Sequence, residues 1–396
     1  MGITILKPGR EKSVFHRHPW IFSGAIDREE GCKTPGETTE IVSSKGIKLG
    51  KAAYSPQSQI RARMWTYDPD EDISRDFFRA RLKQAIDLRK TMSIDSDAYR
   101  LVNAESDGLP GIIVDRYNEF IVCQFLSAGA EFWKKEIVNH LAQLLSPKGI
   151  YERSDTDARL KEGLQASAGV LWGDEPPELL EIREGNLRFW VNIHEGHKTG
   201  FYSDQRDNRA LLSELAQGRD ILNCFSYTGG FGVWAMACGA KTVSNADVSA
   251  SVLEISKKNF EMNGLDLSKV GYLQEDVFVC LRKFRDSGKS FDMIILDPPK
   301  FVESKVQFER GARGYKDINL LAFKLLRPGG LLMTFSCSGL ITPELFQKIV
   351  SDAALDAGRE VYILQRLFQA SDHTVSLNFP EGLYLKGLLC KVQNAA

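Results

Sequence analysis

The sequence predicts a multidomain α/β protein whose C-terminal half is a doubly wound, Rossmann-like sheet of about seven strands. Two observations carry this prediction. From Leu187 onward, short apolar runs alternate with amphipathic segments, as strands and helices do in a mostly parallel sheet. Several of the apolar runs end in acidic or glycine-rich segments, and ligands bind at that edge of such sheets. The 396 residues suffice for two or three domains.

The composition is that of a soluble globular chain, with 43% hydrophobic and 26% charged residues. No apolar run approaches the ~20 residues that span a bilayer, so we expect no membrane partner. The first ten residues contain no apolar signal segment. The seven cysteines are scattered and include no CxxC pair, which predicts neither a zinc site nor a disulfide framework. A reducing cytoplasm is the simplest location for such a chain.

Residues 1–72 are predicted to form a small β-barrel, because short strand-like segments alternate with turns that contain Pro or Gly. The first 66 residues hold 11 Lys and Arg against 6 Asp and Glu, although the whole chain has a net charge of −1. Such a basic module suits phosphate contacts. The segment from Arg17 to Phe22 resembles the start of PUA domains, which are RNA-binding pseudo-barrels. We therefore expect Arg10, Lys12 and Arg17 to contact RNA.

Residues 73–185 are predicted to form an α+β middle domain. Apolar residues recur at a spacing near 3.6 over residues 74–92, which predicts a helix. A second helix and four strands follow, with the strands at 99–104, 111–117, 120–126 and 150–153 and the helix at 131–145. The Gly and Pro residues at 172–177 suit a domain boundary or a hairpin.

Residues 186–396 are predicted to form the doubly wound domain. After a first strand at 187–193, the strands of the sheet are expected at 220–225, 242–246, 272–274, 291–296, 331–335, 360–365 and 383–392. The last of these closes the sheet as an antiparallel partner. The helices between them are expected at 230–238, 249–263, 277–286, 318–326 and 343–357.

Asp297 follows a run from Met293 to Leu296 that has no polar alternation, as in a strand buried on both faces. Pro298 and Pro299 cannot donate ladder hydrogen bonds, so the strand must end there. Asp297 is thereby predicted to lie on a rigid turn at the edge where ligands bind. Taken alone, it could equally be an ordinary helix cap.

The stretch 221–232 predicts a strand that runs into a glycine turn and then a helix. Gly229 and Gly230 allow a close approach of the backbone to a ligand, but the spacing is not the G-x-G-x-x-G of dinucleotide-binding proteins. The turn resembles the first motif of class I S-adenosylmethionine-dependent methyltransferases. By that resemblance Asp247 accepts the ribose hydroxyls, and an acid after the third strand contacts the adenine amine. The residues predicted to bind this cofactor are Phe225, Ser226, Tyr227, Thr228, Gly229, Asp247, Asp276 and Gln205.

Cys337 lies in a polar Ser-Cys-Ser segment just after the strand next to the one that ends at Asp297. A cysteine is usually a small buried hydrophobe, and we keep that interpretation for the other six. A thiolate that adds to C6 of cytosine makes C5 nucleophilic enough to accept a methyl group from a sulfonium. Asp297 is then predicted to hold the base at N3 and its exocyclic amine. The residue that removes the C5 proton is not identified.

Motifs along the whole chain resemble those of the bacterial ribosomal RNA large subunit methyltransferase I family. They occur at 9–12, 18–20, 197–206, 223–231, 297–301, 313–319, 335–339 and 380–387. The resemblance implies methylation of a 23S rRNA cytosine at C5, with S-adenosylmethionine as methyl donor, Cys337 as nucleophile and Asp297 as a base-binding residue. Lys198, Lys300 and Phe301 are expected to contact the RNA. Lys300 stands where many RNA cytosine-C5 methyltransferases have a second cysteine, so product release must proceed without one.

Two alternatives are kept open. Methyltransferases that act on an exocyclic nitrogen of a purine have an aromatic residue directly after a similar Pro-Pro motif, where it stacks on the flipped base. Here Phe301 comes one position late, and Cys337 would have no role. The second alternative is a non-catalytic RNA-binding or ribosome-assembly protein with a decayed methyltransferase fold. An enzyme with its own RNA-binding domain can act as a monomer, and the sequence leaves the oligomeric state open.

Overall fold

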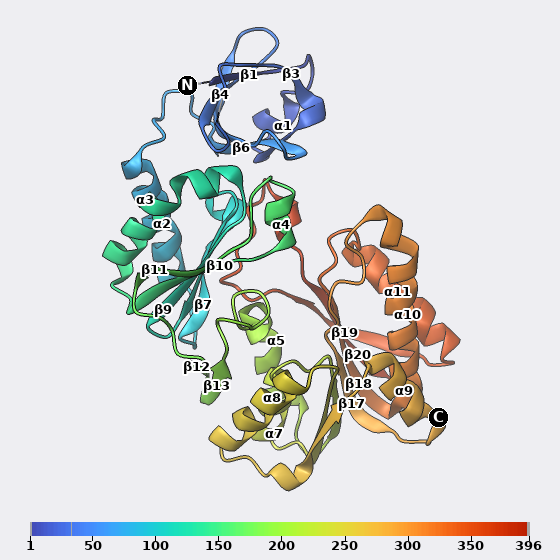
Figure 1. The fold of residues 1–396 in the computed structure, drawn as a ribbon. Coiled ribbons are helices and arrows are strands. Elements are labelled where there is room, and N and C mark those ends of the chain that lie inside the picture. Colours follow the sequence, from blue (N-terminus) through green and yellow to red (C-terminus); the bar gives the residue numbers. More distant parts are fainter. Residues whose placement is uncertain (1, 33, 394–396) are drawn as a thin grey trace. The chain divides into compact units, whose positions relative to one another are not determined.

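The computed structural model describes residues 2–32 and 34–393. They form two compact units (Figure 1). Unit 1 comprises Met1–Gly185, Val191–Ser203 and Ser371–Gly382, and unit 2 comprises Asn186–Trp190, Asp204–Ala370 and Leu383–Ala396. The three-domain division at residues 72 and 185 stays a prediction.

The N-terminal part of unit 1 is a curved six-stranded sheet with the strand order β2-β6-β5-β4-β1-β3 (Figure 1). Its strands are β1 (Gly2–Leu6), β2 (Trp20–Phe22), β3 (Ile26–Glu30), β4 (Thr38–Val42), β5 (Lys48–Tyr54) and β6 (Ile60–Thr66). The expected strands are present. A short helix, α1 (Lys12–Phe15), was not predicted, because four residues are too few for a helical period to be recognised.

The remainder of unit 1 contains a five-stranded sheet in the order β11-β10-β9-β8-β7. Two long helices accompany it, and each begins at a serine whose hydroxyl accepts a backbone N–H: Ser74 for α2 and Ser127 for α3. The elements are α2 (Arg75–Lys90), β7 (Ala98–Asn103), β8 (Ile112–Tyr117), β9 (Phe120–Phe125), α3 (Ala128–Leu145), β10 (Gly149–Ser154), α4 (Asp157–Leu160), β11 (Ser167–Gly173) and β12 (Leu180–Glu184). Strands β11 and β12, which flank the expected boundary at 172–177, were not predicted.

A buried ion pair joins distant segments of unit 1. The Arg100 guanidinium donates to both carboxylate oxygens of Asp115 at 2.8 and 3.0 Å. The same carboxylate accepts the Thr199 hydroxyl at 2.7 Å, and Asp372 accepts the Arg100 backbone N–H at 2.7 Å. The segments 191–203 and 371–382, far away in the chain, are thus held to β7 and β8.

Unit 2 is built on a seven-stranded sheet in the order β16-β15-β14-β17-β18-β20-β19, which confirms the predicted doubly wound sheet. The strands from β14 to β18 are parallel, and β20 is antiparallel to both β18 and β19. The strands are β14 (Asp220–Cys224), β15 (Thr242–Asp247), β16 (Val270–Gln274), β17 (Phe291–Leu296), β18 (Leu326–Ser336), β19 (Val361–Phe368) and β20 (Lys386–Val392). The preceding strand is β13 (Leu187–Val191).

The helices cover both faces of this sheet: α7 and α8 lie on one, and α9, α10 and α11 lie on the other (Figure 1). They are α5 (Arg206–Ala210), α6 (Leu212–Leu215), α7 (Gly230–Ala237), α8 (Ala250–Met262), α9 (Val277–Asp286), α10 (Phe308–Leu325) and α11 (Pro343–Asp356). The four β17 residues Met293, Ile294, Ile295 and Leu296 have no exposed surface, as the unbroken apolar run predicted. None of the helices in the described part of the chain is both long enough and apolar enough to cross a membrane.

Helix α10 begins ten residues earlier than the predicted start at Ile318. Two glycines, Gly311 and Gly314, lower the helix propensity of its first half and obscured it. Gly311 is required by packing, because a Cβ atom there would lie 2.3 Å from Val302 Cγ2 and 2.4 Å from the Phe301 carbonyl oxygen. Gly311 thus lowers the helix propensity of α10 but allows the loop after β17 to lie directly against the helix.

We predict that Asp115→Asn destabilises unit 1 by about 3 kcal/mol, because it leaves the buried Arg100 guanidinium without its counter-charge. Burial favours a higher pKa for Asp115, but the Arg100 charge and hydrogen bonds hold its pKa below the usual value. The contribution of the carboxylate is therefore present above a pH of about 4 and is lost as the pH falls below it.

Hydrogen–deuterium exchange of the β7 and β8 amides measures this effect within unit 1. The matched control is Asp87→Asn, which removes an exposed carboxylate that pairs with Lys83 and Lys90 and should leave these exchange rates unchanged. Equal protection in Asp115→Asn and in the wild type would contradict the prediction.

Candidate active site

Asp297 and Cys337 lie just beyond the ends of two adjacent parallel strands. Leu296, the last residue of β17, pairs with Thr334 of β18. Asp297 therefore follows one strand directly, and Cys337 follows Ser336, the last residue of the other. Both side chains are half-buried. Parallel pairing thus brings an acid and a thiol to the same edge of the sheet.

Ser338 joins the loops that follow the two strands. Its hydroxyl accepts the Val302 backbone N–H at 3.2 Å and shares a hydrogen bond of 2.9 Å with the Tyr315 hydroxyl of α10. Burial raises the pKa of Tyr315, so this phenol stays protonated. The Cys337 Sγ lies 4.0 Å from the Pro298 carbonyl oxygen. The segment with the thiol and the segment with Asp297 are thus held in one arrangement.

The ammonium of Lys386 lies behind the cysteine loop. It donates to the carbonyl oxygens of Ser338 at 2.7 Å and Ile341 at 2.9 Å, and the residue is only 5% exposed. Burial lowers its pKa to about 8. Sequence reasoning assigned no role to this residue, although a lysine among the apolar residues of the predicted strand 383–392 was a visible signal.

The predicted cofactor loop follows β14 and has unusual backbone geometry. Phe225, Tyr227 and Gly229 have φ angles of 56°, 48° and 81°, in the left-handed region that residues with side chains rarely adopt. A Cβ atom on Gly229 would lie 2.2 Å from the Ser256 hydroxyl oxygen of α8. Backbone strain of this kind, at two non-glycine residues in one short turn, is typical of ligand-binding segments.

Asp247, the last residue of β15, faces this loop. Its carboxylate accepts the backbone N–H of Tyr227 at 2.9 Å and of Ser249 at 3.0 Å, one on each oxygen, which leaves further lone pairs for hydroxyl donors. The hydroxyls of Ser226 and Thr228 are buried without a hydrogen-bond partner among the described protein atoms. An acceptor and two unused hydroxyls around a strained turn fit a ribose-bearing ligand such as the predicted cofactor.

Asp276 and Gln205 have structural contacts of their own. Asp276 is exposed and caps α9, because its Oδ1 accepts the backbone N–H groups of Phe278 at 2.9 Å and Val279 at 3.2 Å. Gln205 is buried, and its Oε1 accepts the Asn208 amide at 2.6 Å. Their roles in cofactor binding stay predictions.

Phe301 packs into an aromatic cluster. Its ring centroid lies 4.7 Å from that of Tyr315, 5.7 Å from that of Phe278 and 6.2 Å from that of Phe225. The cluster connects the loop after β17 with the cofactor loop. Lys300, the residue before Phe301, is exposed.

Four predicted RNA-binding residues belong to unit 1, namely Arg10, Lys12, Arg17 and Lys198, and all four are exposed. The Lys198 ammonium lies 4.3 Å from the centroid of the Tyr202 ring. Arg10 and Lys12 flank the start of α1. These four side chains are accessible to a polyanion.

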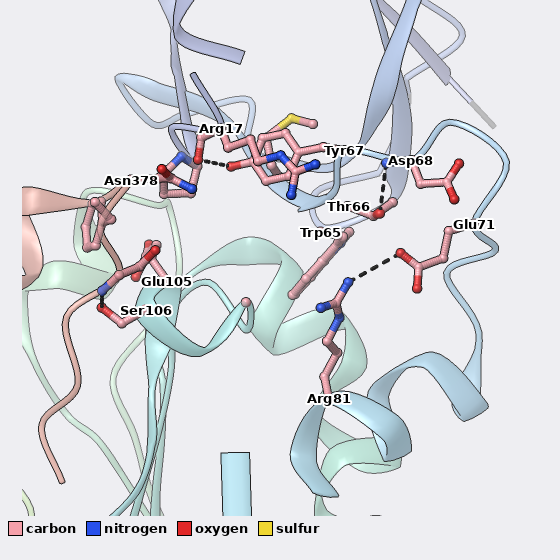
Figure 2. Close-up of a pocket in the computed structure, with 15 residues that line it drawn as sticks. Arg17, Trp65, Thr66, Tyr67, Asp68, Glu71, Arg81, Glu105, Ser106 and Asn378 are labelled. Atoms are coloured by element: carbon pink, nitrogen blue, oxygen red, sulfur yellow. Dashed lines mark hydrogen bonds and ion pairs between the residues drawn. The ribbon is translucent and has the colours of Figure 1, made fainter. Parts of the chain in front are cut away.

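Arg17 also lines a cavity of about 400 Å³ in unit 1 (Figure 2). Its backbone carbonyl accepts the Tyr67 hydroxyl at 2.6 Å, and its guanidinium lies 5.9 Å from the centroid of the Tyr67 ring. Glu71 and Arg81 pair across another part of the cavity wall at 3.4 Å, as Figure 2 shows. Arg17 is the one predicted RNA-binding residue in this wall.

The two histidines near Lys198, His194 and His197, form hydrogen bonds with other residues. The imidazole of His194 bonds to the Tyr151 hydroxyl at 3.2 Å and the Pro176 carbonyl at 3.0 Å. His197 bonds to the Tyr202 hydroxyl at 3.2 Å. Within residues 2–32 and 34–393, no cluster of three or more His, Cys, Asp or Glu side chains is arranged to hold a metal ion.

Comparison with known proteins gives the family. The profile of an S-adenosylmethionine-dependent methyltransferase family matches residues 159–373, and that of a PUA-like domain matches residues 5–67. A solved structure, a putative S-adenosylmethionine-dependent methyltransferase from Streptococcus mutans, is 25% identical with a TM-score of 0.86 and covers 99% of this chain and 100% of its own. The predicted PUA-like fold, methyltransferase fold and cofactor are therefore confirmed.

Two relatives named ribosomal RNA large subunit methyltransferase I match over nearly the whole chain. The protein from Tolumonas auensis is 54% identical and covers 99% of this chain and 100% of its own length. The protein from Erwinia tasmaniensis is 52% identical and covers 98% of both. With this identity over this length, the chain belongs to the ribosomal RNA large subunit methyltransferase I family of S-adenosylmethionine-dependent methyltransferases.

Proposed function

We propose that the protein methylates a cytosine of 23S rRNA at C5, with Cys337 as covalent nucleophile and Asp297 as the residue that holds the base. The observation that carries this proposal is the position of a thiol and an acid at the ends of adjacent parallel strands, β18 and β17. The names of the relatives support ribosomal RNA as the substrate. Such a substrate also supports action in the bacterial cytoplasm.

The chemistry requires a nucleophile because C5 of cytosine is unreactive by itself. The Cys337 thiolate forms a bond to C6, and the electron pair of the C5–C6 double bond makes C5 nucleophilic. Bound S-adenosylmethionine would supply an electrophilic methyl group to C5, and its S–CH3 bond would break to leave S-adenosylhomocysteine. Loss of the C5 proton to a base then restores the double bond and expels the Cys337 thiolate.

Asp297 has two tasks in this scheme. Its carboxyl group accepts a hydrogen bond from the exocyclic amine of the cytosine, which selects the base and fixes the ring. In its acid form it also donates a hydrogen bond to N3, where electron density accumulates as the thiolate adds to C6. The rigid turn made by Pro298 and Pro299 keeps the carboxyl group in place.

The packing of Phe301 weighs against the purine alternative. That reaction needs an aromatic ring that can stack on a flipped base. The Phe301 ring instead contacts Phe225, Phe278 and Tyr315. A non-catalytic role is disfavoured by the cofactor loop, in which Asp247 keeps hydrogen-bonding capacity for a ribose.

We predict that Cys337→Ala abolishes methyl transfer while S-adenosylmethionine binding persists, because the substitution removes only the nucleophile. The assay follows labelled methyl groups into protein-free 23S rRNA and identifies the product by nucleoside analysis. The wild type should yield 5-methylcytidine. The control is Cys238→Ala, which alters another half-buried cysteine of unit 2 and should stay active. A methylated purine, or full activity of Cys337→Ala, would exclude the covalent mechanism.

Asp247→Asn is predicted to weaken S-adenosylmethionine binding about tenfold, because hydrogen bonds to a charged acceptor contribute about 1.5–3 kcal/mol. Titration calorimetry measures the dissociation constant. Asp266→Asn is the matched control, since Asp266 also accepts a backbone N–H, that of Ser268, but lies in another loop of unit 2. Unchanged affinity in Asp247→Asn would mean that the ribose lies elsewhere.

Arg17→Ala is predicted to make RNA affinity less sensitive to salt. For each lost phosphate contact, the slope of log affinity against log salt should become shallower by ~0.7–0.9. Arg28→Ala, which alters an exposed arginine of β3 that pairs with Glu30, serves as control. Identical slopes for Arg17→Ala and the wild type would rule out a phosphate contact at Arg17.

A further inference from the structure

We propose that Lys386 is the positioning residue of Cys337: its ammonium fixes the loop that carries the thiol and supplies the positive charge that favours the thiolate at neutral pH. The inference rests on the proposed role of Cys337 as nucleophile and adds a second group to that site. It concerns unit 2 alone, since both residues belong to it.

The first observation is geometric. Lys386 begins β20 and pairs with Ser336, the last residue of β18 before Cys337. From there its Nζ reaches the carbonyl oxygens of Ser338 and Ile341 at 2.7 and 2.9 Å. Both acceptors belong to the loop that follows Cys337. Two of the three N–H donors of the ammonium are thus used to hold this loop against the sheet.

The second observation is that burial of the Lys386 ammonium is energetically unfavourable. Lys386 is 5% exposed, and the nearby residues Leu385 and Leu388 of the same segment are 1% and 2% exposed. An ammonium taken out of water is unfavourable unless hydrogen bonds or an opposite charge compensate it. A methionine would fill the same space without that penalty. Packing alone therefore does not explain the positive charge of Lys386.

The surrounding charges point to the thiol. The pKa of Lys386 is lowered to about 8, chiefly by burial; a Cys337 thiolate acts in the opposite direction, and the Lys300 ammonium contributes to the lowering. Of the other groups at this site, the Tyr315 phenol is kept neutral by burial and bonds to Ser338. The Asp297 carboxyl lies at the end of β17. A charged Lys386 and a Cys337 thiolate thus stabilise each other, as cations near cysteine generally do.

The test is the pH dependence of Cys337 alkylation by iodoacetamide, followed by mass spectrometry of the peptide that contains Cys337. In the wild type, the half-maximal rate should occur below the ordinary thiol value of about 8.5. In Lys386→Met this midpoint should rise by about one unit, since an opposite charge nearby lowers a pKa by about 1–3 units. Lys391→Met, an exposed lysine of the same strand, should match the wild type.

A second variant separates charge from folding. Lys386→Gln keeps an N–H donor for the loop carbonyls but has no charge, so it should show the same upward shift. Calorimetric binding of S-adenosylmethionine reports whether each variant is folded. A wild-type midpoint at or above 8.5, which needs no variant, would overturn the proposal. So would equal midpoints in the wild type and in whichever neutral variant is folded.

Methyl-transfer kinetics distinguish this inference from the proposed function. At pH 7 the rate of Lys386→Met should fall about tenfold and recover as the pH rises, because one pKa unit is a tenfold change in thiolate. Full activity of Cys337→Ala would refute the covalent mechanism while leaving the alkylation shift intact. An essential Cys337 with identical alkylation profiles in the wild type and Lys386→Met would refute the role of Lys386 alone.

Discussion

The parallel pairing of β17 with β18 is the constraint on which the site depends. Its register sets Leu296 beside Thr334, so that Asp297 and Cys337 emerge at one edge of the sheet. The prolines after Asp297 end β17 and keep its side chain on a turn. The pairing of the two strands is sufficient to bring Asp297 and Cys337 to this edge. The cofactor loop after β14, which pairs with β17, opens at the same edge.

Hydrogen bonds then hold the loops at this edge of the sheet in one arrangement. Ser338 bonds to Val302 and Tyr315 and so ties the cysteine loop to the loop after β17 and to α10. The Phe301 cluster continues the connection to the cofactor loop. Cys337, Asp297 and the loop after β14 are thus parts of one packed assembly, as the proposed reaction with three participants requires.

Sequence patterns were sufficient to predict the features that depend only on residues close together in the chain. The buried run before Asp297, the doubly wound sheet that follows from alternating elements and the acid at the end of β15 were all readable from neighbouring residues. Lys386 was not, because its importance depends on pairing with Ser336, fifty positions earlier in the chain. The start of α10 was hidden by glycines whose reason is contact with Phe301 and Val302. The structure shows Asp276 as the cap of α9, a role that its place directly before the predicted helix 277–286 already allowed, and its contact with the cofactor stays a prediction.

The central claim is the covalent bond between Cys337 and C6 of cytosine, and a trapping experiment tests it most directly. A 23S rRNA fragment in which 5-fluorocytidine replaces cytidine can be methylated but has no C5 proton to lose, so the adduct cannot resolve. Incubation with S-adenosylmethionine should give a complex stable to denaturation, and mass spectrometry should place the RNA on the peptide containing Cys337. The complex should be absent with Cys337→Ala. Turnover of normal rRNA without any trapped complex, or a complex formed through another residue, would contradict the account.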